Sequence, residues 1–68
     1  MKIIYDPEND IIDLILSLEE VAESDEIREG IIVDYSKDGK IVSIEILDAS
    51  EKVADPKGIQ YEMKSNVA

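Results

Sequence analysis

The amino-acid sequence predicts a small α+β domain, with an antiparallel β-sheet of four to five strands, arranged mostly as a meander, and one short C-terminal helix. Two observations support this fold class. The apolar residues are mostly β-branched aliphatics, with isoleucine dominant, and such side chains suit a pleated surface better than a helix. The chain also carries a weak internal repeat, in which a tyrosine precedes a polar turn and an alternating aliphatic run.

The two copies of this repeat predict two β-hairpins. The copies begin at Tyr5 and Tyr35, about 30 residues apart. Both polar segments suit a type I turn followed by a residue in the left-handed region, which is a common three-residue hairpin loop. Asn9 is expected in the left-handed position of the first loop, and Gly39 in that of the second.

The length of these loops fixes the register and decides which side chains share a face. Three-residue loops place Ile4 opposite Ile12, and Ile32 opposite Ile44. The face that these pairs define is the predicted core: Ile4, Ile12, Leu14, Leu16, Ile32, Val42, Ile44 and Ile46. The opposite face is predicted to carry Ile3, Tyr5, Ile11, Ile15, Ile31, Val33, Tyr35 and Ile41 among Asp13, Ser43 and Glu45. A solvated face is rarely so apolar, so we expect the C-terminal segment or a second subunit to cover part of it.

The remaining segments complete the predicted architecture. Residues 21–27 are expected to form a polar edge strand, with a short helix as the alternative. Asp48 is a candidate N-cap for a C-terminal helix, with Glu51 completing a capping box and Pro56 ending the helix at the residue before it. We expect residues 1–55 to form a single β-rich domain and residues 56–68 to form an extension, either a short strand or a disordered tail.

The composition argues against catalysis. The chain has no cysteine and no histidine, which removes disulfides, the common zinc sites and the usual bases and nucleophiles. We therefore expect no enzyme, no catalytic residue, no cofactor and no metal site. The acidic turn Asp6–Asp10 has oxygens at alternate positions, like a calcium loop, but Ile11 stands where that loop needs glycine. A structural turn is favoured there.

The formal net charge of −10 points to a basic partner and away from nucleic acid and anionic membranes. Solubility alone is the other explanation of this charge. The sequence contains no apolar run of membrane-spanning length and no signal-peptide pattern at Met1, so we expect a cytoplasmic location. The candidate docking patch for the partner, which a solvated edge would also explain, consists of Glu19, Glu20, Glu23, Asp25 and Glu26. The candidate dimer face consists of Tyr5, Ile15, Val33 and Tyr35.

Several blocks of the sequence resemble a known family. They are the tyrosine–aspartate turn at Tyr5, the stretch Val21–Ser24, the run Gly30–Tyr35 and the segment Ile44–Ser50. In this order they are similar to the YuzE-like small proteins, a prokaryotic family of unknown function. The resemblance implies an antiparallel, β-rich α+β fold in a bacterial or archaeal cytoplasm. It implies no site residues, because the family has no established activity.

Two hypotheses about function follow from these features. The first is a non-enzymatic protein-interaction module, a homodimer that binds a basic protein, as an antitoxin-like regulator would. The second is a small metal- or metabolite-responsive protein that uses the acidic turn between Asp6 and Asp10 or the acidic cluster that begins at Glu19.

Overall fold

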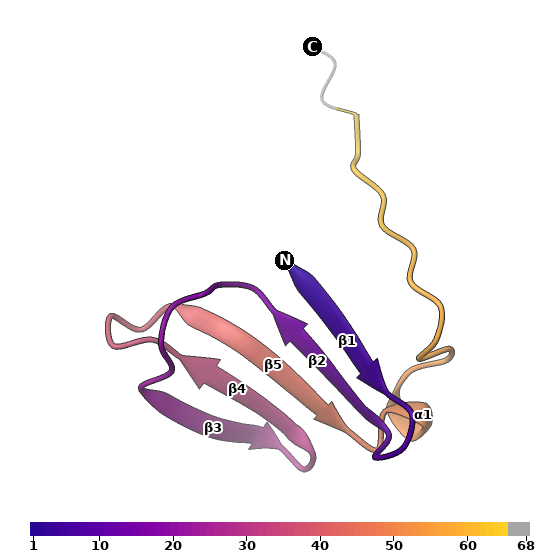
Figure 1. The fold of residues 1–68 in the computed structure, drawn as a ribbon, viewed down its shortest axis with the longest axis horizontal. Coiled ribbons are helices and arrows are strands. Elements are labelled where there is room, and N and C mark those ends of the chain that lie inside the picture. Colours follow the sequence, from indigo (N-terminus) through magenta and orange to yellow (C-terminus); the bar gives the residue numbers. More distant parts are fainter. Residues whose placement is uncertain (66–68) are drawn as a thin grey trace.

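A computed structural model describes residues 1–65 and contains one five-stranded antiparallel sheet and one short helix (Figure 1). The strands are β1 (Lys2–Asp6), β2 (Ile11–Ile15), β3 (Glu23–Arg28), β4 (Ile31–Tyr35) and β5 (Ile41–Leu47), and helix α1 (Ala49–Lys52) follows β5. The order across the sheet is β1-β2-β5-β4-β3. The predicted fold class is confirmed, with the strand count at five.

The predicted meander is wrong at one connection. β2 pairs with β5, and residues 16–22 carry the chain past the end of the sheet to β3 at the far edge (Figure 1). The pairing of Leu14 with Ile44, and of Ile12 with Ile46, joins two aliphatic strands in the middle of the sheet. The acidic strand β3 is then left at an edge, where its charges remain hydrated and discourage further pairing.

The first hairpin has a longer loop than predicted. Asp6 pairs with Ile11, so four residues form the loop, and Asp10 rather than Asn9 lies in the left-handed region, with a φ of 56°. The Asp6 carboxylate holds the turn together, because it accepts hydrogen bonds from the Glu8 and Asn9 backbone N–H groups at 3.0 and 3.3 Å. One additional loop residue turns every side chain of β1 to the other face.

The second hairpin has the predicted loop but an unpredicted bulge. The Ser36 N–H donates to the Lys40 carbonyl at 2.8 Å, and Gly39 has a φ of 83°. Beyond this loop the register shifts between Asp34 and Tyr35, where β5 contains one residue more than β4. Because of this β-bulge, Ile32 lies opposite Glu45 instead of Ile44.

The two register changes revise the predicted core. Ile4 and Ile32 lie on the face opposite to Ile12 and Ile44, and Leu16 is 39% exposed. The side chains that take their places come from the predicted outer face: Ile3, Tyr5, Ile31, Val33 and Tyr35. The buried apolar residues are Ile12, Val33, Val42 and Ala49, and no large side chain of residues 1–65 is fully buried.

The segment between the hairpins is a strand, so the edge-strand prediction is confirmed over its helical alternative. All residues of β3 are exposed, and a tight turn at Gly30, with a φ of 76°, connects β3 to β4. Gly30 also accepts a backbone hydrogen bond from Leu47 at 2.8 Å, which joins this turn to the end of β5.

Helix α1 begins where predicted but is shorter. Asp48 occupies the N-cap position, but its φ is 51° and its side chain makes no capping hydrogen bond, so the predicted capping box with Glu51 is wrong. The helix ends at Lys52, and Val53 is already extended, well before Pro56. A helix of one turn cannot cover a face of the sheet.

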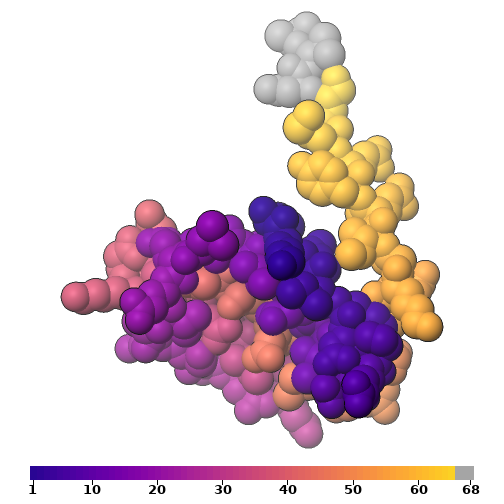
Figure 2. Space-filling model, in the orientation of Figure 1, coloured from indigo at the N-terminus to yellow at the C-terminus, as the bar shows by residue number. Residues whose placement is uncertain are grey.

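The C-terminal segment leaves the sheet. Residues 57–65 contain no strand or helix and extend away from the body of the molecule (Figures 1 and 2). The apolar side chains Ile59, Tyr61 and Met63 are 62%, 83% and 81% exposed. This part of the predicted extension therefore covers neither face of the sheet, and the part of the prediction that concerns residues 66–68 lies outside the described residues.

Candidate functional site

One face of the sheet is almost entirely apolar. Facing residues on paired strands share a face, so the register defines rows of side chains across the sheet. One row contains Tyr5, Ile12, Ile46 and Ile31, and the next contains Ile3, Leu14, Ile44 and Val33. We call these eight residues, with Val42 and Tyr35, the apolar face. Most of them are only half-buried because α1 lies at the end of the sheet and nothing in residues 1–65 forms a second layer (Figure 1).

The other face combines five carboxylates with five aliphatic side chains, which are Ile4, Ile11, Ile15, Ile32 and Leu47. We call it the acidic face, and its charged members from the paired strands are Lys2, Asp6, Asp13, Glu26, Asp34 and Glu45. Asp13 and Glu45 lie directly opposite each other on the two central strands β2 and β5. Like charges in directly facing positions destabilise a sheet. The facing carboxylates Asp13 and Glu45 therefore lower the stability of the sheet, and the fold does not require acidic residues at these positions.

A hydrogen-bonded chain crosses the acidic face beside this pair. The Asp34 carboxylate accepts hydrogen bonds from the Ser24 hydroxyl at 2.5 Å and from the Ser43 hydroxyl at 2.6 Å. Ser24, Asp34 and Ser43 face each other on β3, β4 and β5, so the chain ties three strands together. Because both oxygens of Asp34 have donors, its charge is fixed in position on a half-buried part of the sheet.

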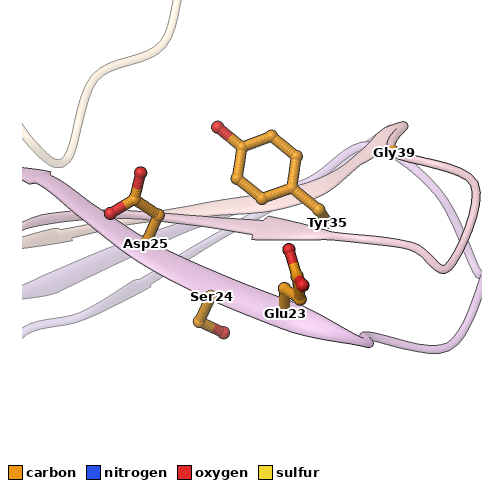
Figure 3. Close-up of a pocket in the computed structure, with 5 residues that line it drawn as sticks. All are labelled: Glu23, Ser24, Asp25, Tyr35 and Gly39. Carbon is orange, nitrogen blue, oxygen red and sulfur yellow. The ribbon is translucent and has the colours of Figure 1, made fainter.

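The predicted docking patch is divided by the alternation of β3. Glu23 and Asp25 lie on the same side as Tyr35, at the border of the apolar face, whereas Ser24 points to the opposite side (Figure 3). With Tyr35 and Gly39 they line an open hollow at this corner of the sheet. Glu26 belongs to the acidic face, and Glu19 and Glu20 lie in the loop that precedes β3. The five residues therefore do not form one surface.

Three of the four residues of the predicted dimer face share one face of the sheet. Tyr5, Val33 and Tyr35 lie on the apolar face, but Ile15 pairs with Lys2 and Ser43 on the acidic face. The error has the same cause as the core error: the predicted register placed β1 and β4 with their side chains reversed, while β2 kept its orientation.

Hydrogen bonds within the loop hold the acidic turn in its conformation. Asn9 donates its side-chain N–H to Asp6 at 2.8 Å, and this bond, with those from the backbone, lowers the pKa of Asp6. A second carboxylate of the turn, that of Asp10, is also hydrogen-bonded. Within residues 1–65 no group of three or more His, Cys, Asp or Glu side chains is arranged to hold a metal ion.

Asp10 holds α1 against the first hairpin, a contact that the sequence analysis missed. Its carboxylate accepts hydrogen bonds from the Ser50 hydroxyl at 2.6 Å, the Ser50 N–H at 3.0 Å and the Tyr5 hydroxyl at 2.8 Å. The Ser50 and Tyr5 side chains lower the pKa of Asp10, and the bond to Asp10 raises the pKa of Tyr5. Because Asp10 and Ser50 are 40 positions apart, no local pattern could indicate this cap.

The fold and its two faces define a class: a single-layer antiparallel sheet protein with one apolar face and one acidic face. Within residues 1–65 no helix has the length and hydropathy that a membrane span requires. Residues 2–50, which include all five strands, match a family described as a protein of unknown function (DUF2283). The chain belongs to this family. Comparison with curated proteins and with solved structures gave no match.

Proposed function

We propose that this protein is a non-enzymatic interaction module that forms a homodimer through its apolar face and binds a basic protein with its acidic face. The observation that carries the proposal is the uncovered apolar face, which spans β1, β2, β5 and β4. Large contiguous apolar surfaces of this kind mark interaction sites in soluble proteins.

A second copy is the occupant that fits the apolar face best. On the apolar side of the sheet the charged side chains are confined to the edge strand β3, where Glu23 and Asp25 lie, so two apolar faces can meet over β1, β2 and β5 without bringing the carboxylates of two copies together. Stacked sheets lie about 10 Å apart with their inner side chains interdigitated. Such a dimer would give the half-buried residues Leu14 and Ile44 the second layer that they lack in one chain.

A basic protein is the partner that the acidic face favours. The carboxylates on this face outnumber its lysine, and the net charge of −10 would attract a cationic partner over a long range at low salt. The facing pair Asp13 and Glu45 lowers stability, and such locally unfavourable arrangements are expected at functional sites. An antitoxin-like chain that neutralises a small basic toxin is one concrete form of this function. The same proposal includes membership of the YuzE-like small proteins and a cytoplasmic location.

The homodimer is tested by a matched pair of variants on β2. Leu14→Glu places a charge on the apolar face, and Ile15→Glu places the same charge on the other face one residue later. Sedimentation equilibrium is expected to give a dimer for the unmodified protein and for Ile15→Glu, and a monomer for Leu14→Glu. Circular dichroism verifies folding, and Leu14→Ala, which is expected to weaken association by about tenfold or more, replaces Leu14→Glu if that variant is unfolded. A monomeric unmodified protein, or dimers of both Glu variants, would contradict the proposal.

The basic partner is tested with two double variants that each remove two negative charges. Asp13→Asn with Glu45→Gln acts on the acidic face, and Glu23→Gln with Asp25→Asn acts on the edge strand β3. In a pull-down at low salt, the unmodified protein and the β3 variant are expected to capture the same basic protein, and the acidic-face variant is expected to lose it. Capture that is unaffected by both variants, or lost only with the β3 variant, would remove the acidic face from the proposal.

A further inference from the structure

The C-terminal segment has the pattern of a strand without a partner. From Ile59 to Lys64, apolar and polar residues alternate strictly, with Ile59, Tyr61 and Met63 on one side. Period-two alternation is typical of a strand that buries one side. In the structure these three side chains are 62%, 83% and 81% exposed, so the side that the pattern would bury is largely exposed.

The sheet has one edge that is open to such a strand. β1 and β3 are the two edges. β3 carries three carboxylates and a register shift between Glu26 and Arg28, both of which discourage the addition of another strand. The middle of β1 is Ile3-Ile4-Tyr5, which has no charge and no proline, and Ile3 and Ile4 are 36% and 41% exposed. Between its charged ends, Lys2 and Asp6, the edge of β1 therefore has neither a charge nor a proline to discourage strand addition.

We propose that residues 59–63 of one copy add to β1 of a second copy as an antiparallel sixth strand, and that two copies exchange these segments reciprocally. This inference rests on the proposed homodimer. The second copy is the occupant because the segment runs outward from its own sheet after α1 (Figures 1 and 2). The apolar side chains of the segment are therefore accessible to a neighbouring molecule. The β1 edge of the same chain is left without a sixth strand.

Charge and shape favour one register of this pairing. When Tyr61 lies opposite Ile3, Glu62 lies opposite Lys2 and Ile59 lies opposite Tyr5. The pairs are then one opposite-charge pair and two aromatic–β-branched pairs, which are the types that stabilise antiparallel strands. Moving the segment by two residues places Lys64 opposite Lys2. A shift of one residue would turn Ile59, Tyr61 and Met63 onto the acidic face.

In the favoured register the segment extends the apolar face by one strand. Tyr61 and Ile59 join Ile3 and Tyr5 on that face, so strand addition and face-to-face association bury the same side of the molecule. The region that matches the family ends at residue 50, so the segment lies outside it.

Paired cysteines test the proposed register in the full chain, which has no cysteine of its own. The double variant Ile3→Cys with Tyr61→Cys places two thiols in facing positions, where Cα atoms are about 4.5–5.5 Å apart and a disulfide can form. The control Ile4→Cys with Tyr61→Cys places the thiols on opposite sides of the new strand pair. After mild oxidation of the native protein, a non-reducing gel is expected to show a covalent dimer for the first variant and at most one tenth as much for the control.

Each outcome decides the inference. A covalent dimer specific to the first variant supports it, and a mixture of the two single variants Ile3→Cys and Tyr61→Cys should then yield the same product. A disulfide within one chain overturns it, because the segment would then pair with its own β1 edge. A dimer by sedimentation that forms no specific cross-link overturns this inference alone, whereas a monomeric protein overturns the proposed homodimer as well.

Discussion

Ile44→Ala is expected to reduce the free energy of unfolding by about 2–5 kcal/mol, the range for truncating an isoleucine in a packed core. Ile44 lies in the middle of the apolar face, between Leu14 on β2 and Val33 on β4. It is half-buried in one chain, and the truncation of a half-buried side chain costs only about 1 kcal/mol. The larger loss therefore requires a second layer over the apolar face.

The matched control for this prediction is Ile32→Ala. Ile32 is also half-buried, but it lies on the acidic face opposite Glu45 and Glu26, so we expect a loss of about 1 kcal/mol. Urea unfolding at two protein concentrations measures both variants, and the midpoint of the unmodified protein should rise with concentration if association stabilises it. Equal losses for the two variants would mean that the apolar face is not covered.

Ile32 and Ile44 also show how far the sequence could predict the fold. Their strands, the turns that precede and follow them and the fold class were predictable, because period-two alternation and turn residues are local signals. Their relative orientation was not. Loop lengths of three and four residues suit similar turn residues, and a bulge between Asp34 and Tyr35 leaves no clear mark in the sequence. One residue in either place reverses a strand.

The pairing of β2 with β5 was missed for a different reason. Strands that are adjacent in the sequence usually pair with each other. Only a comparison of the possible strand orders shows that Leu14 is better placed against Ile44 than against acidic β3. The acidic face could not be predicted for the same reason, because it depends on which strands are neighbours in the sheet. Its central pair, Asp13 and Glu45, is separated by 31 intervening residues and becomes a cluster only when β2 and β5 are neighbours. The acidic residues before and in β3, by contrast, are adjacent in the sequence and form a local signal.

Replacing Asp10 by glycine is expected to lower the thermal unfolding midpoint by about 4–8 °C at pH 7, through the loss of a helix cap and of a bond to Tyr5. Glycine is the informative substitution because Asp10 has a φ of 56°, which glycine adopts without strain and alanine does not. Asp10→Asn, which keeps one acceptor oxygen and tolerates this conformation, should have a smaller effect.

The effect of Asp10 should depend on pH in a defined direction. Its pKa is lowered from the ordinary value of 3.8 in the folded protein, so its contribution to stability is complete above that value and is lost as the pH falls through the lower folded pKa. Thermal unfolding followed by circular dichroism should therefore show a difference between the unmodified protein and Asp10→Gly at pH 7 that shrinks below pH 3.8. Tyr5 limits the stability at high pH. Its pKa is raised, so its contribution to the free energy of unfolding is complete below pH 10.0 and is lost as the pH rises through the raised pKa. A difference that is the same at pH 7 and in acid would mean that the carboxylate charge of Asp10 does not hold α1 against the hairpin.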